Sequence, residues 1–367
     1  MTILWNYTVG LKTASGMCIF KIYPTSPPRG WVGGSLMNKR QIIKHLREEN
    51  AGELFAEADR VREEYMGDAI HLRGLIEFSN ICGCDCLYCG LRRSNACIKR
   101  YRMDIEEIFQ SIQAAYQLGY KSVVLQSGEH CEFSVMDLCS LLSRVKKNFD
   151  IAITLSIGEK TYEEYKILKE SGADRYLLRF ETSHEALFKK LKPDSSYEKR
   201  MECLKWLKDL NYQVGSGIML GLPGQTDEMI ADDILLMKQM DLDMIGIGPF
   251  IVNPHTPLEN EKSGTLFLTL KTLALIRIVT KNTHIPATTA MGSIDPNGRQ
   301  KALQCGANVL MPNVTPTKYR EHYQLYPNKI CISDSPSDCF GCISSMAASL
   351  GRTISSDHGH SLKKTVA

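Results

Sequence analysis

The sequence lacks a charge excess of either sign and any long apolar run. Its 367 residues include 44 Lys and Arg against 41 Asp and Glu, which gives a net charge of +3. This balance offers no electrostatic basis for binding nucleic acid or an anionic membrane surface. No apolar run is long enough to span a bilayer, and residues 1–36 lack the apolar core and cleavage site of a signal peptide. We therefore expect neither nucleic acid nor membrane as a partner.

The sequence also lacks the cysteine spacing of a secreted disulfide framework. It contains 13 cysteines, but a chain of this length has no need of such a framework. Several of them, such as Cys139, Cys203 and Cys305, lie in apolar patterns and are expected to be buried free thiols. In a reducing cytosol, clustered cysteines usually indicate metal or redox chemistry. We expect a cytoplasmic, oxygen-sensitive protein.

The chain shows no low-complexity region, no strong repeat and, after Met37, no linker. The first stretch, 1–36, is rich in Pro and Gly and lacks periodicity, so we expect an irregular arm, with Met37 as a candidate natural start. We expect two helices within 37–70, a barrel over 71–351 and a flexible tail at 352–367. Together these make one domain with additions at both ends.

From residue 71 onward, short apolar strands alternate with amphipathic helices through eight rounds. This alternation predicts a parallel sheet, and eight units favour a closed (β/α)8 barrel, with a doubly wound open sheet as the alternative. The predicted strands are His71–Phe78, Ser122–Gln126, Ile151–Ser156, Arg175–Arg179, Gln213–Leu220, Met244–Ile247, Ala287–Ala290 (weak) and Asn308–Met311. The predicted helices are Lys39–Glu49, Glu53–Met66, Asp104–Leu118, Val135–Lys147, Thr161–Ser171, Tyr197–Leu210, Thr226–Met240, Leu268–Val279 and Gly298–Cys305.

Polar residues follow the first four predicted strands, at their carboxyl ends. A cysteine loop follows the first, Gln126–Glu129 the second, Thr154–Glu159 the third and Glu181 the fourth. In a (β/α)8 barrel the carboxyl ends of the strands carry the chemistry. We therefore expect these residues to converge.

The cysteine loop contains the spacing C-x3-C-x2-C as Cys82, Cys86 and Cys89. Three thiolates on a four-iron–four-sulfur cluster leave one iron open, and that iron can chelate S-adenosylmethionine (SAM). An electron from the cluster then cleaves SAM to a 5′-deoxyadenosyl radical. The aromatic Tyr88 favours this interpretation, whereas Cys84 also permits other spacings. A zinc site or a redox thiol group is the alternative, but no nearby residue supplies a paired fourth zinc ligand.

Longer motifs carry a closer resemblance. The chain resembles the radical SAM superfamily and, within it, the FeFe-hydrogenase maturase family called HydE, from about residue 37 to about residue 351. The matching stretches are Ile76-Glu-Phe-Ser-Asn80, Cys86-Leu-Tyr-Cys-Gly-Leu-Arg-Arg93, Lys99-Arg-Tyr-Arg102, Val124-Leu-Gln-Ser-Gly-Glu129, Asp174-Arg-Tyr-Leu-Leu-Arg179, Gly221-Leu-Pro-Gly-Gln-Thr226, Gly246-Ile-Gly-Pro-Phe250 and Ile285-Pro-Ala-Thr-Thr-Ala-Met-Gly292.

The resemblance implies a set of SAM contacts. Glu181 matches the carboxylate that holds the SAM amino group, and Arg200 matches the arginine that pairs with the SAM carboxylate. As alternatives, Glu181 and Arg200 could form a surface pair and Ser127 could be a turn residue. The expected cofactor-binding residues are Tyr88, Gln126, Ser127, Gly128, Glu129, Thr154, Ser156, Arg179, Glu181 and Arg200.

A second cysteine group, Cys331, Cys339 and Cys342, has the spacing C-x7-C-x2-C. Some family members carry an auxiliary cluster at the matching positions, so the resemblance implies a 2Fe–2S or 4Fe–4S cluster here. Three free thiols or an oxidised pair are the alternatives. The resemblance further implies a substrate cavity, although barrel packing is nearly as good an explanation for each of its residues: Arg73, Thr288, Thr289, Met291, Tyr323 and Tyr326.

By resemblance, the radical would act on a small cysteine-bound iron carbonyl/cyanide precursor and prepare the di-iron centre of FeFe hydrogenase. The electron donor would be a ferredoxin or flavodoxin, and other hydrogenase maturases are expected partners. A biotin-synthase-like sulfur-insertion enzyme, a methylornithine-type mutase and a non-enzymatic iron–sulfur carrier are the alternatives.

Overall fold

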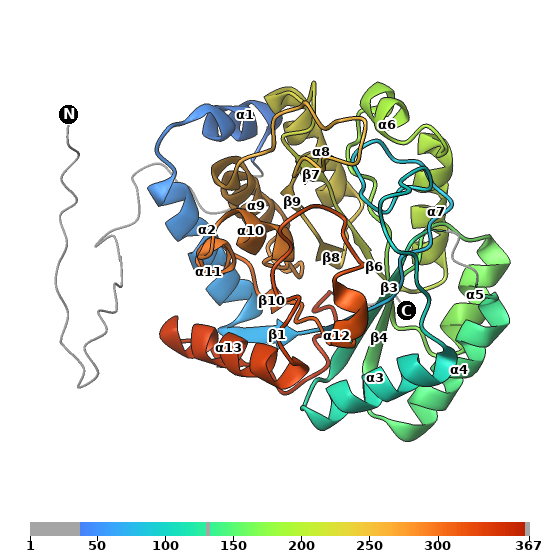
Figure 1. The fold of residues 1–367 in the computed structure, drawn as a ribbon. Coiled ribbons are helices and arrows are strands. Elements are labelled where there is room, and N and C mark those ends of the chain that lie inside the picture. The colour runs from blue at the N-terminus through green and yellow to red at the C-terminus, as the bar shows by residue number, and fades with distance from the viewer. Residues whose placement is uncertain (1–36, 130–132, 364–367) are drawn as a thin grey trace.

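The structure, a computed structural model, describes residues 37–129 and 133–363. Parallel strands lie at the centre and helices surround them (Figure 1). The expected arm at 1–36, and with it the question of a start at Met37, lies outside the described residues. Within the described ranges, no helix is long and apolar enough to cross a membrane.

Six parallel strands form the main sheet, in the order in which they occur along the chain. A doubly wound sheet would reverse its strand order at a switch point. The uninterrupted order of the six strands therefore favours the barrel over that alternative. The strands are β2 (Gly74–Ser79), β3 (Ser122–Ser127), β4 (Ala152–Ser156), β5 (Arg175–Leu177), β6 (Gln213–Ser216) and β8 (Met244–Ile245).

Isolated bridges continue this sheet from β8 back to β2. The predicted first strand divides at Arg73, and its first part, β1 (Ala69–Leu72), pairs with β10 (Val309–Leu310). Segment 284–286 lies between β8 and β10. The bridges join Met244 to His284, Pro286 to Val309, and Leu75 to Asn313. Parallel pairing thus runs around the whole ring, although single bridges replace regular ladders on one side.

Helices cover the outside of the ring (Figure 1). Their first turns are capped by side chains such as Asp104 and Thr161, which form capping boxes with residues three positions later. The helices predicted between strands are present with small changes in bounds. They are α3 (Ile105–Gln117), α4 (Val135–Asn148), α5 (Tyr162–Glu170), α7 (Tyr197–Asp209), α8 (Asp227–Gln239), α9 (Leu266–Thr280) and α11 (Gly298–Leu303).

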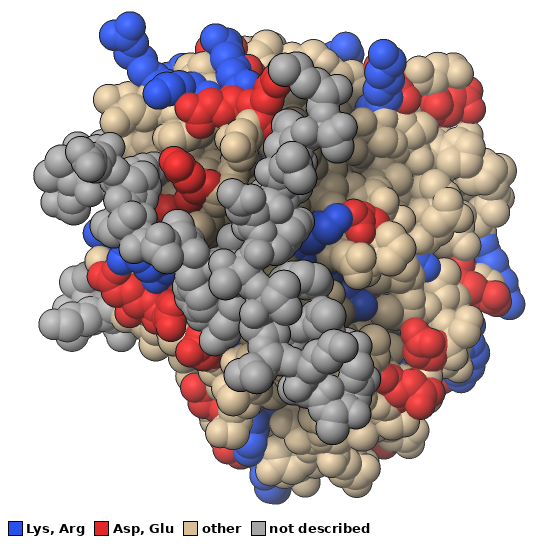
Figure 2. Space-filling model, turned by 90° about the vertical axis from the view of Figure 1, so that its left-hand side faces the viewer, with Lys and Arg blue, Asp and Glu red and all other residues tan. Residues whose placement is uncertain are grey.

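Both predicted N-terminal helices are present as α1 (Lys39–Arg47) and α2 (Gly52–Met66). Helix α1 packs on α8 and α9, and α2 packs on α9. Arg47 also lies 2.9 Å from Asp227 and 2.6 Å from Glu228, so ion pairs join α1 to α8. On the molecular face shown in Figure 2, basic and acidic side chains are likewise interspersed.

The weak strand predicted at Ala287–Ala290 is wrong. Thr289 instead begins helix α10 (Thr289–Ile294), and only the neighbouring Pro286 bridges to β10. The predicted strand Gln213–Leu220 divides into β6 and β7 (Met219–Leu220), with 217–218 between them. The remaining elements were not predicted, because the β-strands span only two residues and the helices are short or contain cysteines. They are α6 (Glu185–Leu191), α12 (Thr317–Arg320), α13 (Pro336–Ser349), β9 (Gly248–Pro249) and β11 (Thr353–Ile354).

The C-terminal segment, expected to be a flexible tail over 352–367, is packed across its described part, 352–363. Strand β11 pairs with β1. Beyond it, the carbonyl oxygen of His358 accepts a hydrogen bond from Arg175 at 2.6 Å, and His284 contacts the carbonyl oxygen of His360 at 3.0 Å. Arg175 lies at the start of β5, so the segment covers the amino-terminal end of the barrel.

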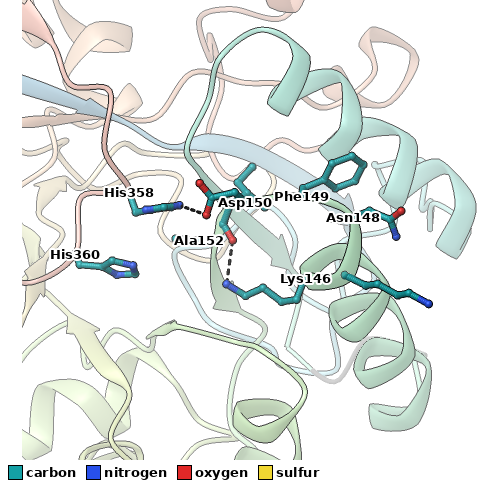
Figure 3. Close-up of a pocket in the computed structure, with 9 residues that line it drawn as sticks. Lys146, Asn148, Phe149, Asp150, Ala152, His358 and His360 are labelled. Atoms are coloured by element: carbon teal, nitrogen blue, oxygen red, sulfur yellow. Dashed lines mark hydrogen bonds and ion pairs between the residues drawn. The ribbon is translucent and has the colours of Figure 1, made fainter.

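A pocket lies beside this segment, between it and the end of helix α4 (Figure 3). His358 and His360 line one side, and His358 lies 3.0 Å from Asp150. Lys146 donates to the carbonyl oxygen of Ile151 at 2.9 Å. The pocket is thus at the opposite end of the barrel from the cysteine loop.

Candidate active site

The cysteine loop follows β2, and hydrogen bonds from the Arg100 side chain to backbone carbonyl groups hold its shape. Arg100 donates to the carbonyl oxygens of Asn80 and Leu91, at 2.8 Å each, and to that of Arg92 at 2.6 Å. The fixed donors of one guanidinium group therefore tie the start of the loop to its end.

The end of β3 packs closely against this loop at Gly128. The Gly128 N–H donates to the carbonyl oxygen of Ser79 at 3.0 Å. A Cβ atom at Gly128 would lie 2.1 Å from the carbonyl oxygen of Ile81 and 2.8 Å from Cβ of Cys82. Gly128 was predicted to bind the cofactor, and the structure shows that a glycine is needed here for close approach to the cysteine loop itself.

The loop thiols differ in their environments. Cys84 and Cys86 are buried, whereas Cys82 and Cys89 are partly exposed. A hydrogen bond between the thiols of Cys84 and Cys82 lowers the pKa of Cys82 and raises that of Cys84. Burial raises the pKa of Cys86, and the Lys192 ammonium opposes this effect. The side chains of Cys82 and Cys84 are thus close enough to share a hydrogen bond.

A buried network of alternating charges lies next to the loop. Arg200 donates to both carboxylate oxygens of Glu129, at 3.0 and 3.2 Å, and its Nε lies 2.7 Å from Glu159. Burial would raise the pKa of Glu129, but Arg200 and Lys192 outweigh that effect and lower it to about 2. Burial also opposes the charge of Lys192, yet its pKa is raised, because negative groups including Cys86 and Glu129 surround it. The alternative of a surface pair between Glu181 and Arg200 is wrong: Arg200 is buried and, within the described chain, pairs with Glu129 and Glu159.

Glu181 follows β5 in a left-handed backbone conformation, with φ of 64°. Backbone hydrogen bonds to Gly217 and Met219, at 3.0 Å each, hold it there. Its Oε2 lies 2.8 Å from Nη2 of Arg179, but the angle is not that of a hydrogen bond and this buried oxygen has no other partner. Arg179 neutralises the carboxylate but leaves this oxygen without a well-directed hydrogen bond, which is costly for a buried acceptor. Left-handed backbone conformations of residues other than glycine also cluster at functional sites. The carboxylate is therefore suited to accept a ligand's N–H, as the amino group of SAM would offer.

Other predicted SAM-side residues lie at the same ends of β3 and β4. Gln126 donates to the hydroxyl of Tyr323 at 3.2 Å, and Ser127 donates to the carbonyl oxygen of the next residue at 2.8 Å. The Thr154 hydroxyl is buried and has no hydrogen-bond partner. Ser156 is half-buried. Gln126 thus links the predicted SAM side to the predicted substrate side through Tyr323.

The predicted cavity residues do not all lie together. Thr288 donates to the carbonyl oxygen of Ile247 at 3.1 Å, close to buried Met291 and the start of α10 at Thr289. Tyr326 is half-buried. Arg73, by contrast, lies at the amino-terminal end of the barrel. It contacts the sulfur of Met244 and donates to the carbonyl oxygen of Gly359 at 3.2 Å.

Sequence reasoning missed a second buried ion pair, between Glu77 on β2 and Lys329. Glu77 also accepts a hydrogen bond from Asn313 at 3.0 Å, and the Lys329 ammonium lies 5.0 Å from the ring centre of Tyr323. A glutamate within an otherwise apolar strand was the available signal, because a buried carboxylate requires a partner. Sequence reasoning also missed the buried position of Lys192, because this residue lies outside every predicted helix and strand.

The second cysteine group is only partly assembled. Ligand atoms of Cys331, Cys339 and Asp334 all lie within 4.8 Å of one another, and within the described residues no other group of three such ligands is as tight. Cys342 is exposed and outside this set. Arg320 holds the segment by donating to the carbonyl oxygens of Cys331 at 3.1 Å and Asp334 at 2.6 Å.

Comparison with known proteins decides the family. A model of the radical SAM superfamily matches residues 76–276. The FeFe hydrogenase maturase subunit HydE of Thermotoga maritima is 52% identical over 306 residues, which are 83% of this chain and 88% of that protein. The chain belongs to the HydE family. It is a radical SAM enzyme of the FeFe-hydrogenase maturation type, as the resemblance predicted, and the family implies a 4Fe–4S cluster and SAM.

Other similarities are weaker than that to HydE. The 3-methylornithine synthase of Methanosarcina acetivorans is 29% identical, over 74% of this chain and 77% of that protein. The crystal structure of methylornithine synthase (PylB) shares the fold, with a TM-score of 0.78 at 24% identity, over 88% of this chain and 95% of that one. The HydE assignment thus displaces the sulfur-insertion, mutase and carrier alternatives.

Proposed function

We propose that Cys82, Cys86 and Cys89 hold the 4Fe–4S cluster and leave one iron open for SAM. When bound, cluster and SAM together supply a 5′-deoxyadenosyl radical. One observation carries this assignment: the C-x3-C-x2-C loop ends the first barrel strand beside Glu181, a buried carboxylate with an oxygen that lacks a hydrogen bond. Burial and the nearby charges of Glu181, Cys86 and Cys89 raise the pKa of Tyr88, a residue of the loop, which supports the closeness of loop and carboxylate.

The surrounding residues would bind and orient SAM. Glu181 would accept hydrogen bonds from the SAM amino group, and Arg200, which already neutralises Glu129 and Glu159, would face the SAM carboxylate. Gly128 keeps the end of β3 close to the loop. The other proposed contacts are Tyr88, Gln126, Ser127, Thr154, Ser156 and Arg179.

The substrate we propose is a small cysteine-bound iron carbonyl/cyanide complex. The radical would add adenosyl to its sulfur or break a carbon–sulfur bond, and so prepare the di-iron subcluster. A cavity that contains a radical must exclude water. Hydroxyl and amide groups at its wall, such as the joined Gln126 and Tyr323, would orient polar ligands of the complex. We propose the same for Thr288, Thr289 and Tyr326, with the buried Met291 as an apolar part of the wall. Arg73 lies at the opposite end of the barrel, and we assign it no contact with the substrate.

We further propose that Cys331, Cys339 and Cys342 hold an auxiliary cluster without a catalytic role. The close approach of Cys331 and Cys339 supports this, because two thiols within 4.8 Å of each other could bind the same metal group. A ferredoxin or flavodoxin would supply the electron, in the cytoplasm, where other hydrogenase maturases would receive the product.

Anaerobic reconstitution tests the central proposal. The protein is loaded with iron and sulfide, reduced with dithionite and given SAM, and 5′-deoxyadenosine is measured by chromatography. We expect the wild type to form it and Cys86→Ala to form none. Cys97→Ala is the matched control, because Cys97 is an exposed free thiol near the same loop. Its product yield should equal that of the wild type.

Two results would contradict the proposal. One is wild-type protein that binds iron and sulfide yet shows neither 5′-deoxyadenosine nor a SAM-induced change in its electron paramagnetic resonance (EPR) spectrum. The other is colourless protein with one zinc ion per chain. The substrate is tested separately, by whether a synthetic cysteine-bound iron carbonyl/cyanide complex is consumed in step with 5′-deoxyadenosine.

A further inference from the structure

Lys192 reaches the cysteine loop from a distant part of the chain. It follows helix α6, and only 5% of its surface is exposed. Its ammonium nitrogen lies 3.3 Å from the sulfur of Cys86 and 3.8 Å from a carboxylate oxygen of Glu129. The long alkyl stem therefore lies in the interior, and the charged end points at a sulfur that we have proposed as a cluster ligand.

The contact is built into the backbone. The Leu87 N–H, next to Cys86, donates to the carbonyl oxygen of Leu191 at 2.9 Å. The Asp85 N–H, on its other side, donates to the carboxylate of Asp194 at 2.9 Å. Two hydrogen bonds thus hold the segment around Lys192 against the residues that flank Cys86, so the approach of ammonium to sulfur does not depend on the side chain alone.

The carboxylates near Lys192 do not draw its ammonium group away from the sulfur of Cys86. Glu129 is the nearest carboxylate, but it makes its closer contacts with Arg200, at 3.0 and 3.2 Å. Arg200 also pairs with Glu159. A thiolate next to a buried ammonium is stabilised both by the positive charge and by the N–H donor, and the low polarity of the interior strengthens both effects.

We propose that Lys192 raises the reduction potential of the cluster by donating a hydrogen bond to the sulfur of Cys86. This inference rests on the proposed ligand set. Hydrogen bonds to cluster sulfurs and nearby charge are among the determinants of the potential. A fixed positive charge favours the reduced form, which carries one more negative charge, so Lys192 would make it easier for a biological donor to deliver the electron.

The test compares midpoint potentials in Lys192→Met and wild-type protein, both reconstituted and without SAM. The reduced-cluster EPR signal is followed during a dithionite titration against redox mediators. Loss of a charged hydrogen bond should lower the equilibrium constant for reduction by on the order of tenfold, which is about 59 mV for one electron. Lys190→Met is the control, since Lys190 is an exposed lysine two positions away. Its potential should equal that of the wild type.

A second variant, Lys192→Gln, keeps an N–H donor and loses the charge, and we expect an intermediate potential. Equal potentials in Lys192→Met and wild-type protein would overturn the proposal while leaving the ligand assignment intact. Folded Lys192→Gln without iron would also overturn it, because Lys192 would then serve cluster assembly. Wild-type protein without a cluster would instead refute the ligand assignment itself.

Discussion

The carboxylate of Glu129 and the guanidinium of Arg200 form a buried pair in which Nη2 of Arg200 lies 3.0 and 3.2 Å from the two carboxylate oxygens. Glu129 also accepts a hydrogen bond from the Glu159 backbone N–H at 3.0 Å. These contacts join the ends of β3 and β4 to helix α7. The pair therefore stabilises the packing of these elements and is also part of the proposed SAM site.

Replacing Glu129 by Gln should destabilise the protein. The change leaves Lys192 without its carboxylate and weakens the hold on Arg200, and breaking a buried pair costs about 3–5 kcal/mol. Because Arg200 still pairs with Glu159, we expect the free energy of unfolding to fall by about 3 kcal/mol. Urea unfolding of the cluster-free protein measures this loss. Glu106→Gln removes an exposed pair with Arg144 and is the control, expected to cost less than about 1 kcal/mol. Equal effects of the two changes would refute the structural role.

Glu181→Ala should weaken SAM binding while leaving the cluster in place. A lost hydrogen bond to a charged group costs about 1–3 kcal/mol, roughly a 5- to 150-fold rise in Kd. Isothermal titration of reconstituted protein with SAM measures this. Glu185→Ala, at the exposed start of α6, should leave the Kd unchanged. Unchanged SAM affinity in Glu181→Ala would exclude Glu181 as the partner of the amino group.

Cys84→Ala should keep the cluster, whereas Cys82→Ala should lose it. The reason is the spacing C-x3-C-x2-C, which Cys82, Cys86 and Cys89 form without Cys84. Iron content and the 400 nm absorbance after reconstitution distinguish the two variants. If both lost the cluster equally, the choice of ligands by spacing would be wrong.

Gly128→Ala should impair cluster incorporation, because the new Cβ would meet the Ile81 carbonyl oxygen at 2.1 Å and push β3 away from the loop. Gly246→Ala is the matched control, since no atom lies within 4 Å of the corresponding Cβ. Iron bound per chain should fall severalfold in the first variant only. Full occupancy in Gly128→Ala would show that the loop can move aside at little cost.

Local signals in the sequence sufficed for most elements. Apolar periodicity and caps such as Asp104 and Thr161 located the main helices within a few residues, since these signals act over one or two turns. The order of strands and helices also predicted the parallel ring. The strand predicted at Ala287–Ala290 failed, because a short apolar run does not distinguish a strand from the first turn of a helix.

Contacts between distant segments could not be predicted in this way. Lys192 and Cys86 are 106 positions apart, and Glu77 and Lys329 are 252 apart. Each pair forms only because the barrel brings its strand ends and loops together. The packed C-terminal segment was missed for a related reason: it is held largely by polar contacts, such as those of His358, His360 and Ser361, which leave no apolar periodicity.

The buried carboxylate of Asp233, on α8, should make the stability of the folded protein depend on pH. Its carboxylate is fully buried, accepts a hydrogen bond from the Ser183 N–H at 2.5 Å, and leaves its second oxygen without a partner. Burial outweighs that hydrogen bond and raises the pKa of Asp233 from 3.8 to about 7. The folded state therefore binds a proton more tightly than the unfolded state, so this group favours folding below pH 4 and loses that contribution as pH rises through 7.

Asp233→Asn should remove this dependence. Relative to wild type, the variant should gain stability between pH 5 and pH 8, by a few kilocalories per mole in the free energy of unfolding. Urea unfolding at several pH values measures the difference. Asp232→Asn is the control, because that neighbouring carboxylate is half exposed and pairs with Lys39 at the surface. A parallel pH profile for wild type and Asp233→Asn would mean that Asp233 titrates normally, and its burial would then need a counter-charge that the structure does not show among the described residues.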